Sequence, residues 1–98
     1  MAGLVDNTAR SRYEMTVNDV TAFIDYERTG DTVTLVHTEV PPEMSGQGIG
    51  SKLAQGALDD ARQHGQRIVP RCTFVRKYLE RHPEYQDVIL PSEEGARP

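Results

Sequence analysis

The 98-residue sequence has a single cysteine, no tryptophan and no long apolar run, and these absences exclude several classes of protein. One cysteine allows neither an internal disulfide nor a cysteine-cluster zinc site, so we expect a reducing, cytoplasmic setting and no metal. No segment approaches the roughly 20 apolar residues of a membrane span, and Met1–Arg10 lacks the apolar core of a signal peptide. We therefore expect neither secretion nor membrane insertion.

The sequence also lacks the net positive charge typical of nucleic-acid-binding proteins, because its formal net charge is -4. The charge is uneven, however. Residues 45–82 carry seven basic and three acidic side chains, whereas the rest carries four basic and twelve acidic ones. This asymmetry fits a local site for an anionic cofactor in a domain that attracts a cationic, amine-bearing substrate. Solvated helix faces that happen to be basic would give the same count.

The most informative stretch is Ser45-Gly46-Gln47-Gly48-Ile49-Gly50-Ser51-Lys52-Leu53, which joins an extended β-branched run to an amphipathic helix. Glycines let the backbone approach a phosphate closely, and the first amides of a helix have no partner within the helix. The stretch therefore predicts a pyrophosphate site, although a tight strand-to-helix connection is the alternative.

Two common phosphate loops are excluded by spacing. A Walker loop needs glycine directly before Lys-Ser or Lys-Thr, but Ser51 separates Gly50 from Lys52. A dinucleotide fingerprint would place its third small residue at Ser51, and the chain is too short for the two halves of that fold.

Hydrophobic periodicity predicts an α+β fold with a small mixed sheet and two main helices in a single domain spanning residues 12–90. We expect a flexible arm over residues 1–11 and a disordered tail over 91–98. Strands are expected at 12–17, 20–28 and 32–40, then a helix over 50–64 and a strand over 66–70 that lies parallel to 32–40. A second helix capped by Thr73, with Phe74, Val75, Tyr78 and Leu79 on its buried face, precedes a short strand over 87–90.

The ends of the two parallel strands predict where the chemistry lies. Alternation in 32–40 places Val33, Leu35, His37 and Glu39 on one face, and parallel strands end at the same edge of a sheet. We therefore expect His37 to lie near Cys72. A helix start, a preceding arginine and a nearby histidine all favour the thiolate form of a cysteine, although a lone cysteine is often an inert buried side chain.

Several of these motifs together resemble the GCN5-related N-acetyltransferases. Gly48 and Gly50 match the acetyl-CoA loop Gln/Arg-x-x-Gly-x-Gly/Ala, whereas Ser45 departs from its first position. The segments 37–42, 48–53, 69–72 and 78–85 look more specifically like the minimal branch of that superfamily, whose domains have about a hundred residues. The likeness runs from about Tyr13 to Ile89.

The resemblance implies binding of acetyl-CoA or CoA as cosubstrate and transfer of acetyl to an amine. Backbone amides of the glycine loop would hold pyrophosphate, Lys52 would be available to phosphate, and backbone near Val40 would polarise the thioester carbonyl. Tyr78 is the candidate acid for the departing thiolate, although the larger family's Asn-x-x-Ala spacing is absent here. The expected cofactor-binding residues are Thr38, Val40, Ser45, Gly46, Gln47, Gly48, Ile49, Gly50, Ser51, Lys52 and Cys72.

Two routes of transfer stay open. In direct transfer His37 or Glu39 removes a proton from the amine, and in the covalent route Cys72 accepts acetyl with His37 as its base. The resemblance favours the direct route. A protein that binds CoA or acyl-CoA through a reactive Cys72 with little or no transfer is the alternative function. The acceptor, either a small amine or a protein amine, is not identified, and we expect a monomer or weak dimer that binds neither nucleic acid nor membrane.

Overall fold

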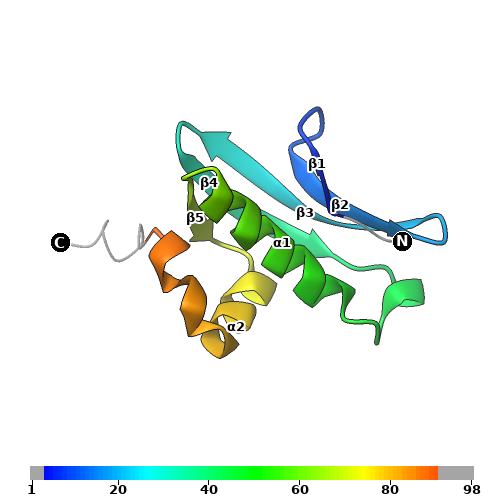
Figure 1. Cartoon of the computed structure of the whole chain (residues 1–98). Coiled ribbons are helices and arrows are strands. Elements are labelled where there is room, and N and C mark those ends of the chain that lie inside the picture. The colour runs from blue at the N-terminus through cyan, green and yellow to red at the C-terminus, as the bar shows by residue number, and fades with distance from the viewer. Residues whose placement is uncertain (1–3, 91–98) are drawn as a thin grey trace.

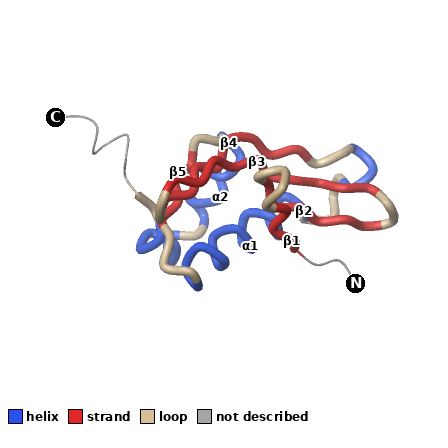
Figure 2. Tube along the Cα trace, turned by 90° about the horizontal axis from the view of Figure 1, so that it is seen from above, coloured by secondary structure: helices blue, strands red, loops and turns tan. Residues whose placement is uncertain are grey.

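The computed structural model describes residues 4–90, which form one five-stranded sheet with both α-helices on the same side (Figures 1 and 2). The strands lie in the order β1-β2-β3-β4-β5. Their bounds are β1 Leu4–Asn7, β2 Arg12–Val17, β3 Val20–Thr29, β4 Thr32–Glu39 and β5 Arg67–Pro70. The helices are α1 Ile49–Gln63 and α2 Thr73–Arg81, with short 3-10 helices at Pro42–Met44 and Pro83–Val88.

The pairing of the strands confirms the predicted mixed sheet and the α+β class. Strands β1 to β4 are antiparallel neighbours, and β5 pairs in parallel with β4 after the crossover through α1. Tight turns connect β2 to β3 at Asn18-Asp19 and β3 to β4 at Gly30, and all three residues have positive φ. The crossover places the start of α1 and the start of α2 beyond the ends of β4 and β5.

One hydrophobic core lies between the sheet and the helices. The predicted helical spacing is confirmed for α1, whose apolar residues are fully or almost fully buried. The largest side chains with no more than 2% exposure are Tyr13, Ile24, Val33, Leu35, Met44, Leu53, Leu58, Ile68 and Val75. At about 25 cal/mol per Å² of apolar surface, such side chains supply most of the favourable free energy of folding.

The N-terminal arm was predicted without regular structure, which is wrong for Leu4–Asn7. This segment pairs with β2 from Leu4 opposite Met15 to Asn7 opposite Arg12. Its Leu4 side chain packs against α1 at Gly56, where an added Cβ would lie 2.8 Å from Leu4 Cδ2. The arm lacked a hydrophobic periodic signal because the second residue on the side of Leu4 is the charged Asp6, which accepts a hydrogen bond from Tyr26. Residues 1–3 lie outside the described residues, as does the whole tail predicted at 91–98.

Three predictions near the C-terminus need correction. Cys72, rather than Thr73, is the N-cap residue of α2, and no side chain caps this helix. Phe74, predicted on the buried face, is 39% exposed because it lies against the start of α1 instead of the core. The predicted strand at 87–90 is wrong, because Asp87 and Val88 belong to the 3-10 helix and Ile89 forms an isolated bridge to Ile68.

The four tyrosines predict how the fold responds to alkali, since burial raises the pKa of every one of them above its usual 10. Hydrogen bonds to carboxylates add to the effect for Tyr13, Tyr26 and Tyr85, and the pKa values of Tyr26 and Tyr85 rise to about 12. Because the folded state holds the proton more tightly, this stability is fully present below pH 10 and is lost as pH rises toward about 12.

We therefore expect tyrosinate absorbance to appear together with loss of the circular dichroism of the fold. The chain unfolded in urea serves as the control and should titrate near pH 10. A tyrosine that ionises near pH 10 while the circular dichroism stays native would contradict this network.

Candidate functional site

The glycine loop presents a row of unpaired backbone amides. After the 3-10 turn at Pro42–Met44, Gly46 and Gly48 adopt left-handed φ values of 81° and 70°, and α1 begins at Ile49 with Gly48 as its N-cap. The first helical hydrogen bond runs from Lys52 N to Gly48 O. Within the described residues, none of the six amides of 46–51 donates a hydrogen bond to a backbone or side-chain acceptor. Such a concentration of donors at the positive end of a helix dipole is the kind of place where proteins bind anions, so the loop is a candidate anion site.

A bulge in β4 changes which of its side chains face the helices. In the pairing with β3, Leu35 lies opposite Tyr26 and His37 opposite Asp25, so that Val36 is an extra residue. Leu35 faces the core, and beyond the bulge Thr38, opposite the buried Ile24, takes over that side. The predicted alternation of Val33, Leu35, His37 and Glu39 on one face is therefore wrong beyond Leu35.

His37 and Glu39 consequently lie on the face of the sheet away from the helices. The ring nitrogen Nε2 of His37 lies 3.1 Å from Glu39 Oε1, and both side chains are more than half exposed. The His37 ring also meets Phe23 edge to face, with ring centroids 6.3 Å apart. These two predicted site residues are thus brought together, whereas no hydrogen bond joins His37 to Cys72 in the described structure and the two side chains lie on opposite sides of the sheet.

Cys72 instead contacts Thr38. Its Sγ lies 3.1 Å from Thr38 Oγ1, and the residue is 7% exposed. This contact joins the two chain segments beyond the point where β4 and β5 stop pairing. Their pairing ends at Leu35 and Pro70, and Leu35 O accepts the amides of both Arg71 and Cys72. Beyond Leu35, β4 is paired with β3 only, so its other edge is open toward Val40.

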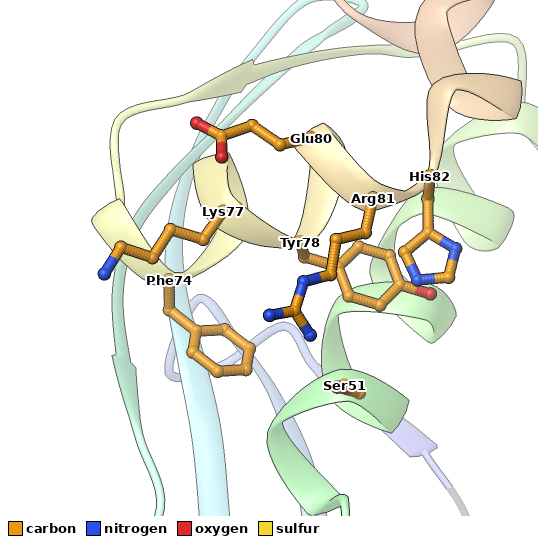
Figure 3. Close-up of a pocket in the computed structure, with 7 residues that line it drawn as sticks. All are labelled: Ser51, Phe74, Lys77, Tyr78, Glu80, Arg81 and His82. Atoms are coloured by element: carbon orange, nitrogen blue, oxygen red, sulfur yellow. The ribbon is translucent and has the colours of Figure 1, made fainter.

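A cavity of about 330 Å³ lies between the first turn of α1 and the exposed side of α2 (Figure 3). Phe74 forms one wall against the glycine loop, because an added Cβ at Gly50 would lie 2.6 Å from the Phe74 ring. The Tyr78 ring stacks on His82 with centroids 4.0 Å apart and forms another wall. The lining residues are Ser51, Phe74, Lys77, Tyr78, Glu80, Arg81 and His82.

The predicted site residues fall into two groups, those that line the cavity and those that do not. Tyr78 and Ser51 line it, whereas Thr38, Cys72 and His37 do not. Burial raises the pKa of Tyr78, which keeps its hydroxyl protonated. The sequence analysis did not predict that Phe74, Lys77, Glu80, Arg81 and His82 line this cavity. The sequence signal that could have indicated this cavity is the pair Lys77 and Arg81, which lies on the exposed side of α2 beside the buried Tyr78 and Leu79.

Among residues 4–90, no helix has both the length and the apolar character needed to cross a membrane. This agrees with the absence of long apolar runs from the sequence.

Comparison with known proteins gives a consistent result. A family model described as GCN5-related N-acetyl-transferase matches residues 12–88. The fold is similar to the solution structure of a GCN5-like protein from Staphylococcus aureus that was named as a candidate N-acetyltransferase. The two share 28% sequence identity with a TM-score of 0.69, over 90% of this chain and 87% of the other.

Proposed function

Because the chain belongs to the GCN5-related N-acetyltransferase family, we propose that it transfers an acetyl group from acetyl-CoA to an amine acceptor. The observation that carries the proposal is the run of six unpaired amides at residues 46–51. Such a run suits a diphosphate, whose oxygens accept hydrogen bonds and whose charge the helix dipole favours. Lys52 in the first turn of α1 adds a positive charge that is exposed to solvent.

The remaining parts of acetyl-CoA fit the two openings beside the loop. The open edge of β4 between Leu35 and Val40 offers backbone hydrogen bonds to the amide groups of the pantetheine arm. Lys77 and Arg81 in the cavity offer cations to the phosphorylated adenosine end. Thr38 and Cys72 then form the wall beside the thioester.

Direct transfer requires a neutral amine. A lysine side chain with pKa near 10.4 is mostly charged at pH 7. Removing the proton from its ammonium group at this pH costs about 4.6 kcal/mol, so a base must take the proton. We assign this role to His37, whose ring is exposed and bonded to Glu39. The amine nitrogen then bonds to the carbonyl carbon, the carbon–sulfur bond breaks, and the CoA thiolate leaves. The role of Tyr78 as the acid for this thiolate stays a prediction, because Tyr78 lines the cavity away from Cys72.

We also place the reaction in the cytoplasm, where the free thiol of Cys72 stays reduced.

Thermal unfolding with added CoA tests the proposal. At a hundredfold excess over Kd, linkage raises the free energy of unfolding by about 2.7 kcal/mol, which is several degrees for a domain of this size. Pantetheine, which lacks phosphates, should give a smaller shift. Lys52→Glu should reduce the shift with CoA more than the shift with pantetheine, and more so at low salt.

The charge reversal Arg10→Glu in the β1–β2 turn is the matched control and should keep the CoA shift. If millimolar CoA leaves the melting temperature of the native protein unchanged, the proposed function is wrong.

A further inference from the structure

The side of the sheet opposite the helices is uncovered, and its composition differs from that of the core side (Figure 2). Strand register defines two rows across it. One row runs Asn7–Arg12–Asp25–His37, and the next runs Val5–Glu14–Phe23–Glu39. We call this surface the open face. Because both rows cross four strands, the open face is broad, unlike the cavity beside α2.

The open face carries more acid than base. Asp25, Glu39 and Glu14 lie on it, and Glu27 extends it along β3. Its one guanidinium, Arg12, is already engaged, with Nε 2.7 Å from Glu14 Oε2 and Cζ 4.2 Å from the Phe23 ring centroid.

Asp25 stands between Arg12 and His37 in its row, and its carboxylate has no hydrogen-bond partner in the described part of the chain. Among the described residues Asp25 and Glu27 therefore form no ion pair on this surface, because the guanidinium of Arg12 is engaged by Glu14.

The bulge at Val36 connects this face to the proposed reaction. His37 lies on the open face, whereas the next residue, Thr38, contacts Cys72 on the cofactor side. One strand thus presents the base to one side and the wall of the thioester site to the other. An acceptor on the open face would meet both at the free edge of β4.

We propose that the open face binds the acceptor, and that this acceptor is a lysine-bearing peptide segment in extended conformation. The inference rests on the proposed acetyl transfer. Charge complementarity supports it, since Asp25 and Glu39 flank His37 and attract an ammonium group. Val5 and Val36, which are 57% and 41% exposed, add apolar contact at the two sides of the surface. A surface that extends across four strands suits an extended chain, whereas a small metabolite is held in a concave site.

A titration followed by nuclear magnetic resonance tests the open face. The full chain, labelled with nitrogen-15 and saturated with CoA, is mixed with the peptide acetyl-Gly-Gly-Lys-Gly-Gly-amide at constant pH. We expect shifts of the amides of Phe23, Asp25, His37 and Glu39. The same peptide with norleucine in place of lysine has no charge and should bind at least several-fold more weakly.

Variants separate a specific surface from general attraction to an acidic protein. The double variant Asp25→Asn/Glu39→Gln should weaken the lysine peptide about fivefold or more, because two exposed charge pairs are removed. Asp31→Asn in the β3–β4 turn makes the same kind of charge change away from the open face, and it should leave the affinity unchanged.

The proposal is overturned if the lysine peptide shifts only residues around α2, if norleucine and lysine peptides bind equally, or if the double variant binds like the native chain. A normal CoA shift in thermal unfolding, combined with any of these results, would reject the acceptor site while keeping the proposed function. Absence of the CoA shift would reject the proposed function itself.

Discussion

Gly48→Val abolishes the stabilisation by CoA, which we expect to fall from about 2.7 kcal/mol at a hundredfold excess to nothing measurable. Gly48 is the N-cap of α1 with φ 70°, and a Cβ added there meets no atom within 4 Å. The space beside it is therefore open to a ligand, and a β-branched side chain would fill it. The variant also strains the loop, because valine rarely adopts positive φ. Calorimetry with CoA measures both effects.

Gly30→Val is the matched control. Gly30 has φ 59°, and a Cβ there also meets nothing within 4 Å, but it lies in the β3–β4 turn. Both variants should lose a similar 1–3 kcal/mol of stability from backbone strain, so only the response to CoA distinguishes them. If Gly48→Val binds CoA like the native chain, the row of amides at residues 46–51 does not hold the diphosphate.

His37→Ala lowers kcat/KM for amine acetylation by 10²–10⁴-fold, the range expected when a general base is removed. Because His37 is exposed, added imidazole should restore part of the activity of this variant. Glu39→Gln should cause a smaller loss, since Glu39 orients the ring through a 3.1 Å contact. Steady-state kinetics with acetyl-CoA and a lysine peptide provide the measurement.

Cys72→Ala distinguishes the two routes of transfer. Direct transfer predicts activity within about tenfold of the native protein, since Cys72 is then only a wall of the thioester site. The contact with Thr38, rather than with His37, favours this route, because the thiol has no neighbouring base in the described structure. An acetyl group on Cys72 after incubation with acetyl-CoA alone, together with loss of turnover in Cys72→Ala, would establish the covalent route.

The sequence predicted the elements whose local signals agree with their tertiary contacts. Helix α1 has buried residues at helical spacing and a glycine-rich start, so its bounds were predicted within about one residue. The parallel β4–β5 pair followed from the single helical crossover. The glycine loop could be singled out from the sequence because its proposed role as a phosphate site depends on backbone groups, which glycine spacing reveals directly.

The sequence failed where a side chain's position depends on strands far away in the chain. No residue type marks Val36 as a bulge, since it appears only when the register with Asp25 and Tyr26 is known. For this reason His37 lies on the opposite side of the sheet from Cys72, although the sequence predicted that the two share one site. Phe74 has the spacing of a core residue, but it lies against Gly50 because α1 and α2 converge at their starts.

The bulge also makes β4 tolerant of changes at Val36. Removing Val36 would leave Leu35 opposite Tyr26 and His37 opposite Asp25 in a strand without a bulge, so His37 would stay on the open face and Thr38 on the core side. If Val36 instead took a place in the regular pairing, it would lie opposite Asp25 and shift His37 opposite the buried Ile24, and every side chain up to the end of the strand would change sides. Point substitutions at Val36 leave the bulge intact, since its side chain is 41% exposed. The sides taken by His37 and Thr38 thus depend on Val36 remaining outside the pairing with β3, and not on the identity of its side chain.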